Sequence, residues 1–555
     1  MKVIKKVVKT SLVLAMLGTT SVFAQNITEA KKAIDAEQYQ KAKSSLKSLA
    51  ASQPTAEVYF HLGNLYLSDY PDSAKAAFNK GIATDSKNSL NYIGLGALDL
   101  AGSNSSAAKA NFDKAIAQAA RKDNDPYIYV AKAYISAPKP DYAAAISHLE
   151  KAIAMDAKDA EAYLALGDAY RGQEKISEAF SAYRSAYDLN KNLLRAKIEL
   201  GVINKRAQAW QESLDEFNKV LAINPNYAPA YREIAETYNR WAQKATDIKD
   251  WEARNQQALT SYIKYMDMTD RSLESRMRYA DFLILAKDYK TLEREAQEMA
   301  KLDETNPRIY RYLGYSAFEN GNTQAAVQSI NDFIAKAGAD RAIPLDYVYL
   351  AKAQLKSGDI TNAVNNLKKA SELDINKTTP VEGLSVIAKD LYTAKKYDLA
   401  AQVYDFTQSA PNAATIDYYW QGNSYYYDYQ SKDLAKANPS KDLLVKADSS
   451  YSRFLQRSPT TESVWLMKAK VNQKYDTNDQ KALARDPYLK YIELVTAKPE
   501  LVEKNKANLI DAYYYLGFTS VKSDPNKARE YFNKVLQLDP THANAQQALK
   551  SLASK

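Results

Sequence analysis

Small and aromatic residues recur along this chain in a pattern that predicts paired helices. Within each half of the segment Ala160–Lys191 most of the recurring positions lie three, four or seven residues apart, so each half places them along one side of a helix. The segment therefore predicts two helices packed against each other. The residues that carry the pattern are Tyr163, Leu166, Gly167 and Tyr170 in the first half, and Ala179, Tyr183 and Ala186 in the second.

The same pattern can be followed down the chain with a period close to 34 residues. The position of Ala179 recurs fourteen times between Ala42 and Ala528, eleven times as Ala, and five of the thirteen spacings are 34. The position of Gly167 recurs thirteen times and is always Gly or Ala. Gly costs about 1 kcal/mol relative to Ala inside a helix, so we expect this position to lie where the two helices approach closely.

These residues resemble the tetratricopeptide repeat (TPR), with an aromatic residue at position 4, Leu-Gly at 7 and 8, Tyr at 11, Ala at 20, an aromatic at 24 and Ala at 27. The resemblance covers about residues 26–541. It implies an all-α fold, an α-solenoid in which about fourteen helix pairs form a right-handed superhelix. After Pro540, the sequence predicts a final amphipathic helix that caps the last repeat.

The expected organisation has four parts. Residues 1–24 form a signal peptide, 25–272 an N-terminal repeat array, 273–541 a C-terminal array with longer inserts, and 542–555 the capping helix. The boundary near residue 272 follows a repeat lengthened by eleven residues, which carry Trp241 and Trp251.

The first 24 residues predict export. Four lysines precede an apolar stretch from Ser11 to Gly18, which is too short to cross a bilayer, and Val22-Phe23-Ala24 suits cleavage after Ala24. Removal of this segment lowers the net charge from +9 to +5, which does not indicate a nucleic-acid-binding face. We expect a periplasmic protein without a transmembrane segment in the mature chain.

The composition offers little chemistry. The chain has no Cys and three His (His61, His148 and His542), which fall in different repeats, and it contains none of the common catalytic motifs. Since each repeat of a solenoid contacts only its neighbours, these histidines should not converge. We therefore expect no enzyme activity, no cofactor and no metal.

The TPR resemblance implies that positions 2, 5, 9 and 12 of each first helix line a concave groove that binds a protein or peptide. In the later repeats several of these positions are aromatic, and 418–429 holds seven aromatic residues in twelve. Two interpretations remain open: the rings line the groove, as exposed Tyr and Trp do at binding hot spots, or longer helices bury them. The candidate partner-binding residues are Arg311, Tyr315, Phe318, Tyr419, Asn423, Tyr426, Tyr514 and Phe518.

The resulting functional hypothesis is a non-catalytic periplasmic scaffold that binds an envelope protein, for cell-envelope assembly or transport. The composition and the Ala-Gln junction resemble large secreted TPR proteins of Gram-negative, Bacteroidota-type bacteria. A carbohydrate- or peptidoglycan-binding module is the first alternative, because Tyr and Trp faces also stack on sugars; an enzyme is the second.

Overall fold

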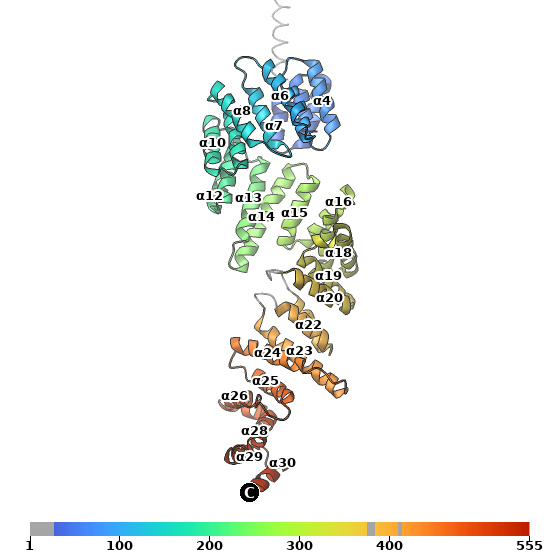
Figure 1. The fold of residues 1–555 in the computed structure, drawn as a ribbon, viewed down its shortest axis with the longest axis vertical. Coiled ribbons are helices and arrows are strands. Elements are labelled where there is room, and N and C mark those ends of the chain that lie inside the picture. Colours follow the sequence, from blue (N-terminus) through green and yellow to red (C-terminus); the bar gives the residue numbers. More distant parts are fainter. Residues whose placement is uncertain (1–26, 375–382, 409–412, 554–555) are drawn as a thin grey trace, which may run out of the picture. The chain divides into compact units, whose positions relative to one another are not determined.

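The computed structural model describes residues 27–374, 383–408 and 413–553 (Figure 1). The signal peptide expected over 1–24 and its cleavage site after Ala24 lie outside the described residues. The chain divides into two compact units, unit 1 up to Leu302 and unit 2 from Asp303. This division falls one helix pair after the boundary that the sequence indicated near residue 272.

Unit 1 begins with a helical stretch over 27–35 and continues through fifteen further helices of the described chain. They are α2 (Tyr39–Ser52), α3 (Ala56–Asn64), α4 (Pro71–Thr84), α5 (Leu90–Ala101), α6 (Ser105–Gln118), α7 (Asp125–Ser136), α8 (Tyr142–Met155), α9 (Ala160–Gly172), α10 (Ile176–Leu189), α11 (Leu194–Arg206), α12 (Trp210–Ile223), α13 (Ala228–Ala242), α14 (Ile248–Met268), α15 (Leu273–Leu285) and α16 (Tyr289–Leu302).

Unit 2 is built in the same way from shorter and longer helices. They are α17 (Pro307–Glu319), α18 (Thr323–Ala337), a 3₁₀ turn η1 (Ala339–Arg341), α19 (Pro344–Ser357), α20 (Ile360–Leu373), α21 (Leu384–Thr393), α22 (Tyr397–Gln408), α23 (Thr415–Leu434), α24 (Asp442–Arg457), α25 (Glu462–Tyr475), α26 (Arg485–Thr496), α27 (Pro499–Lys504), α28 (Lys506–Ser520), α29 (Pro525–Leu538) and α30 (Ala543–Ala553).

The described helices form fourteen consecutive antiparallel pairs, and no strand occurs in the described ranges. The predicted all-α, solenoid-type repeat fold is thereby confirmed. The long repeats owe their length to extended helices: α14 has 21 residues and α23 has 20. None of the helices in the described chain combines the length and the apolar character that a membrane span requires.

Within a pair, the small residue of the first helix lies against a ring of the second helix. A Cβ added at Gly167 of α9 would stand 2.5 Å from the Tyr183 ring of α10, which is closer than real Cβ contacts allow. The same contact recurs at Gly63 with Phe78, Gly96 with Phe112, Gly201 with Phe217, Gly422 with Tyr451 and Gly517 with Phe532. The expectation of close helix approach at this position is confirmed.

The ends of the helices follow from local polar chemistry. Asp159 begins α9 by accepting hydrogen bonds from the backbone N–H groups of Glu161 and Ala162, which otherwise lack an intrahelical partner. After α9, Glu174 takes a left-handed conformation, as does Gln208 one repeat later. These residues reverse the chain between the first and second helices of their pairs.

The C-terminal helix α30 covers the last helix pair, as the sequence predicted for a cap. Its Ala545 and Leu552 are buried and belong to the same core cluster as Phe532 of α29. Such a cap shields the apolar face that another repeat would otherwise cover.

His148 of α8 is held between aromatic rings rather than at a reactive site. Its ring centroid lies 6.0 Å from those of Tyr127 and Tyr134, and its Nδ1 is buried without a hydrogen-bond partner among the described residues. Burial lowers the pKa of His148, and the positive charge of Lys151 lowers it further.

Replacement of Gly167 by Leu should lower the free energy of unfolding by about 1–3 kcal/mol or more, because the new side chain must displace the Tyr183 ring. Gly102 provides the control, since a Cβ there would meet only backbone oxygens at 3.6 Å. Gly102→Leu should change stability by only about 0.5 kcal/mol. Urea denaturation measures both, and equal stability of the two variants would contradict the close approach.

The lowered pKa of His148 predicts a loss of stability on mild acidification. The unfolded chain binds the proton more readily than the folded chain, so the contribution is complete above the usual histidine pKa of about 6.5 and is lost as the pH falls below it. His148→Phe keeps a ring between Tyr127 and Tyr134 but cannot titrate. Its melting temperature should therefore fall less than that of the parent between about pH 7.5 and 5.5; an equal fall in both proteins would contradict the assignment.

Candidate functional site

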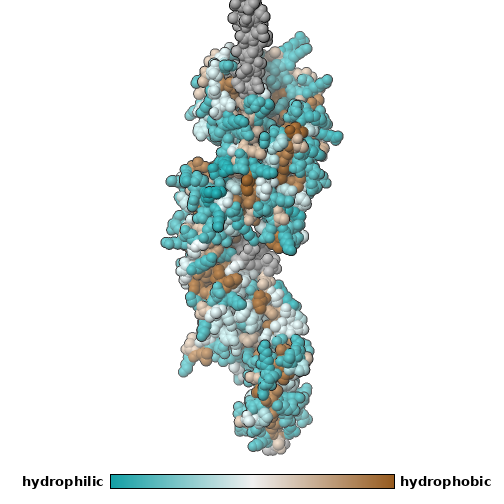
Figure 2. Space-filling view, turned by 180° about the vertical axis from the view of Figure 1, so that it is seen from behind, coloured by the Kyte–Doolittle hydropathy of each residue, from teal (hydrophilic) through white to brown (hydrophobic). Residues whose placement is uncertain are grey.

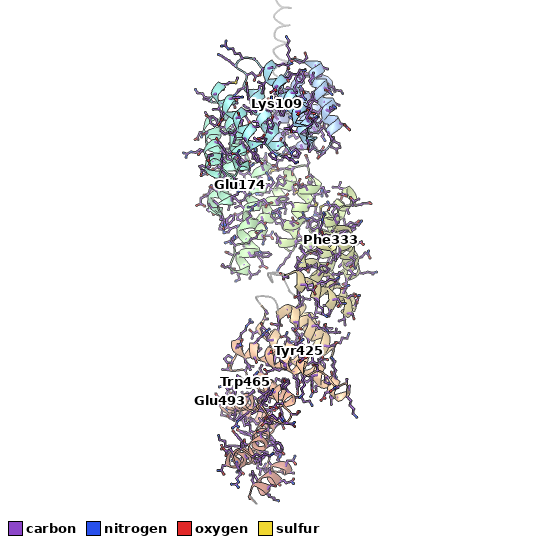
Figure 3. All side chains as sticks on the ribbon, in the orientation of Figure 1. Lys109, Glu174, Phe333, Tyr425, Trp465 and Glu493 are labelled. Carbon is purple, nitrogen blue, oxygen red and sulfur yellow. The ribbon has the colours of Figure 1, made fainter. Side chains whose placement is uncertain are left out.

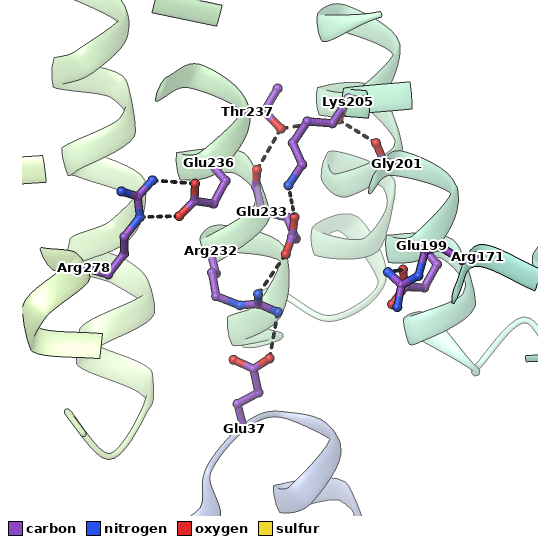
Figure 4. A network of polar contacts seen from close by, with 11 residues as sticks. Glu37, Arg171, Glu199, Gly201, Lys205, Arg232, Glu233, Glu236, Thr237 and Arg278 are labelled. Atoms are coloured by element: carbon purple, nitrogen blue, oxygen red, sulfur yellow. Dashed lines mark hydrogen bonds and ion pairs between the residues drawn. The ribbon is translucent and has the colours of Figure 1, made fainter. Parts of the chain in front are cut away.

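The first helices of unit 1 are joined by a ladder of ion pairs (Figure 4). Arg171 of α9 pairs with Glu199 of α11 at 2.6 Å, and 34 residues later Lys205 of α11 pairs with Glu233 of α13. Arg278 of α15 donates two hydrogen bonds of 2.6 Å to the carboxylate of Glu236 on α13. These charges neutralise one another, because each ladder pair brings a cation and a carboxylate from neighbouring repeats together.

The turn after the first helical stretch contacts the seventh helix pair of the same unit. Glu37, in a left-handed conformation, accepts hydrogen bonds of 2.9 Å from Arg232 and from the Tyr265 hydroxyl (Figure 4 shows the Arg232 contact). The Gln38 side chain donates to the carbonyl of Met268. Unit 1 thus brings together segments about 230 residues apart in sequence, which the sequence pattern did not indicate.

Three of the predicted partner-binding residues lie in the packing between α17 and α19. Arg311 donates two hydrogen bonds, of 2.7 and 2.8 Å, to the fully buried carboxylate of Asp346. The Tyr315 hydroxyl donates to the same carboxylate, and its ring stacks on Tyr349 at 4.1 Å. Phe318 meets the edge of the same Tyr349 ring.

The expectation that Tyr315 and Phe318 present exposed rings is therefore wrong. Tyr315 is 1% exposed and Phe318 7%. The Arg311 side chain remains partly exposed, but Asp346 already accepts hydrogen bonds from two of its guanidinium N–H groups. The physical reason is Asp346: a carboxylate buried between helices requires donors, and position 9 of the preceding first helix supplies a hydroxyl for it.

The aromatic stretch of α23 is divided between core and surface. Tyr425, labelled in Figure 3, is buried and its hydroxyl donates to Asp405 of α22. Asn423 is 3% exposed and accepts a 2.6 Å hydrogen bond from the Tyr451 hydroxyl, so the prediction that it lines an open groove is also wrong. For these residues the second interpretation holds, since the long α23–α24 pair buries them.

The remaining predicted residues keep part of their surface accessible. Tyr419 and Tyr426 are half-buried against the α23–α24 core. Tyr514 is half-buried between Phe532 and His542. Phe518 is 67% exposed. Their role in partner binding stays a prediction.

Unit 2 carries a cluster of rings on α21, α22 and α23 that we call the α21–α23 aromatic surface. Its residues are Val386, Lys389, Tyr392, Tyr397, Ile416, Trp420 and Tyr427. The Tyr392 ring centroid lies 5.2 Å from that of Trp420 and 5.3 Å from that of Tyr397. The Lys389 ammonium lies 4.8 Å from the centre of the Trp420 ring.

This surface is open to solvent at one end. Val386 is 64% exposed and Ile416 51%, and a 2.6 Å hydrogen bond between their sequence neighbours Ser385 and Asp417 holds α21 and α23 together there. On the face drawn in Figure 2, hydrophobic residues reach the surface in patches between hydrophilic ones.

The prediction of partner-binding residues from repeat positions 2, 5, 9 and 12 did not identify the group formed by Trp420, Tyr427 and Tyr392. On α23, Ile416, Trp420 and Tyr427 are spaced by four and seven residues and share a helix face. That spacing is visible in the sequence. Their approach to Tyr392, in contrast, depends on how α21 packs beside α23, which repeat positions alone did not reveal.

The described residues hold no group of three or more potential metal-ligating side chains. His61, His148 and His542 lie on α3, on α8 and immediately before α30, respectively.

A pair of truncations tests which predicted residues are structural. Tyr315 and Phe518 occupy the same repeat position, one residue after Gly314 and Gly517, but differ in exposure. Tyr315→Ala should lower the free energy of unfolding by about 3–5 kcal/mol, because it removes a buried ring and leaves Asp346 short of a donor. Phe518→Ala should change it by about 0.5 kcal/mol. Urea denaturation measures both, and similar losses would contradict the assignment.

Comparisons with known proteins agree with this architecture. Residues 141–193, which span α8 to α10, match the model of the tetratricopeptide repeat family. Over 109 residues the chain is 25% identical to tetratricopeptide repeat protein 37 of Xenopus laevis; the match covers 20% of this chain and only 7% of that protein.

The chain is also similar to two solved structures of TPR proteins. The C-terminal part of a TPR repeat-containing protein from Cytophaga hutchinsonii is 25% identical, with 49% of this chain and 99% of that chain covered and a TM-score of 0.28. A tetratricopeptide repeat protein from Parabacteroides merdae is 17% identical, with 50% and 98% covered and a TM-score of 0.31. The match to the tetratricopeptide repeat family covers residues 141–193, and the helix pairs that recur along the described residues have the architecture that such repeats imply.

Proposed function

We propose that this protein is a non-catalytic scaffold of the periplasm that binds a partner protein or peptide of the cell envelope on the α21–α23 aromatic surface. The TPR fold is that of a protein–protein interaction scaffold. The observation that carries the proposal is the cluster of Tyr392, Trp420 and Tyr427 on α21 and α23, two helices that also expose the side chains of Val386 and Ile416.

The chemistry of this surface suits a protein partner. Tyr and Trp offer large, rigid contact area together with a polar group, and they are enriched where binding energy concentrates. Val386 and Ile416 add exposed aliphatic area on the same two helices, which a partner would bury. Burial of such area is favourable by roughly 25 cal/mol per Å².

The geometry favours a protein over a sugar. The Tyr392 and Trp420 rings are inclined by 60°, and those of Tyr392 and Tyr427 by 65°, so they do not form one flat platform. Lys389 covers a face of Trp420. A stacked sugar requires an open ring face, whereas apolar side chains of a partner can fit between inclined rings.

The periplasmic location rests on the N-terminal sequence. Lysines, a short apolar stretch and small residues before Gln25 form the pattern of a cleaved export signal. That location and a TPR scaffold fold support a role in envelope assembly or transport.

Photo-crosslinking tests the proposal. A photoreactive residue replaces Thr393, which is exposed and adjacent to Tyr392, in the full-length chain expressed in its own host. The periplasmic fraction should contain the mature chain beginning at Gln25, joined to a specific protein. Adding Val386→Asp and Ile416→Asp should weaken binding of that protein by about thirtyfold or more, since hot-spot residues contribute about 2 kcal/mol.

The control replaces two exposed aliphatic residues outside the α21–α23 aromatic surface by Asp. Ile248 and Val445 are 60% and 46% exposed on α14 and α24, so Ile248→Asp with Val445→Asp should keep the crosslink. A crosslink that survives in both double variants would disprove the site. Binding to purified peptidoglycan that only the Val386/Ile416 variant loses would show the carbohydrate alternative instead.

A further inference from the structure

Unit 1 contains a pocket of about 440 Å³ at the ends of its sixth and seventh first helices. It lies where α11 and α13 end and α12 begins, and α15 closes one side. Pockets of this size hold small ligands or a few side chains of a partner. The lining residues are Lys205, Arg206, Gln208, Trp210, Glu236, Asn239, Arg240, Gln243, Lys244 and Arg278.

The lining is strongly basic, with five cations and one carboxylate. Two of the cations are neutralised within the fold. Lys205 pairs with the buried Glu233, and Arg278 forms a bidentate ion pair with Glu236 (Figure 4). These paired residues fix the position of the pocket wall, because both of their partners belong to α13.

The other three cations are available. Arg206, Arg240 and Lys244 are exposed, and their side chains have no hydrogen bond or ion pair with any residue that the structure describes. The C-terminal ends of α11 and α13 favour nearby positive charge, which accounts for cations at these positions. Their gathering around one pocket leaves about three uncompensated positive charges within a small volume.

We propose that this pocket binds an acidic segment of a partner protein through its carboxylates. Arg206, Arg240 and Lys244 supply the charge, and the amides of Gln208 and Gln243 lie beside them as additional donors. Trp210 adds a half-buried ring against which the methylene groups of Asp and Glu side chains can pack. This surface belongs to unit 1 and does not depend on the α21–α23 aromatic surface.

The confinement of the charge favours an acidic peptide over a nucleic acid. A phosphate backbone needs a long basic track, and its binding increases with the number of phosphates that it contacts. Here the unpaired cations surround one pocket. The other charged residues along α9, α11 and α13 that form the ladder are already neutralised by ion pairs. A short peptide segment that carries carboxylates matches the small size of this basic region.

Fluorescence anisotropy tests the proposal with the mature full chain and a labelled oligoglutamate peptide. The peptide should bind at low salt and weaken as salt rises, and an oligoglutamine peptide of equal length should not bind. Arg206→Gln, Arg240→Gln and Lys244→Gln together should raise the Kd for oligoglutamate by about tenfold or more, because charge complementarity supplies the affinity. The melting temperature should not change, since all three side chains are exposed.

The matched control removes the same charge from another part of unit 1. Lys80, Lys87 and Lys158 are exposed and lie outside the pocket, so their triple Gln variant should change the Kd by no more than about twofold. Equal weakening in both triple variants would show nonspecific attraction and overturn the site. A single-stranded oligonucleotide that binds more tightly than oligoglutamate, and that only the pocket variant loses, would overturn the acidic-peptide assignment.

Discussion

The contact that recurs most often in the structure is an aromatic ring of a second helix packed against a glycine of the first helix, which occurs in six of the described helix pairs. Gly167 against Tyr183, and Gly422 against Tyr451, show this contact in both units. Because the ring fills the space of a missing Cβ, it fixes the distance between the two helices of a pair. Most helix pairs contact their neighbours, apart from the turn at Glu37 that reaches the seventh pair, so this local contact is repeated along the chain instead of being replaced by one central core.

The preference for Tyr over Phe has a second physical reason. Several rings that pack between helices also donate a hydrogen bond from their hydroxyl to a carboxylate: Tyr183 to the buried Asp168, Tyr315 to the buried Asp346 and Tyr425 to the exposed Asp405. A buried carboxylate without donors would destabilise the fold, and a phenol supplies both apolar area and a donor. This use of Tyr within the fold explains why a high Tyr count gives little information about binding.

The two surfaces that we propose for partner binding carry groups that the described fold does not satisfy internally. On unit 1 they are cations at the ends of α11 and α13; on unit 2 they are inclined rings and exposed aliphatic side chains on α21 and α23. The two differ in chemistry, one charged and sensitive to salt, the other apolar. A scaffold with both can distinguish a partner that offers acidic and apolar segments from one that offers only one of them.

The sequence by itself determined the helix pairs, their period and the close contact at Gly167, because these arise within a repeat and every copy repeats the same signal. It also placed Phe518 correctly at the surface. Only the tertiary structure decided that Tyr315 and Asn423 are buried, since their partners Asp346 and Tyr451 lie on other helices, 31 and 28 residues away. The same holds for Trp420 beside Tyr392 and for Glu37 beside Arg232. A repeat position specifies a face of a helix, but the residue that meets that face belongs to another helix, and its identity varies from repeat to repeat.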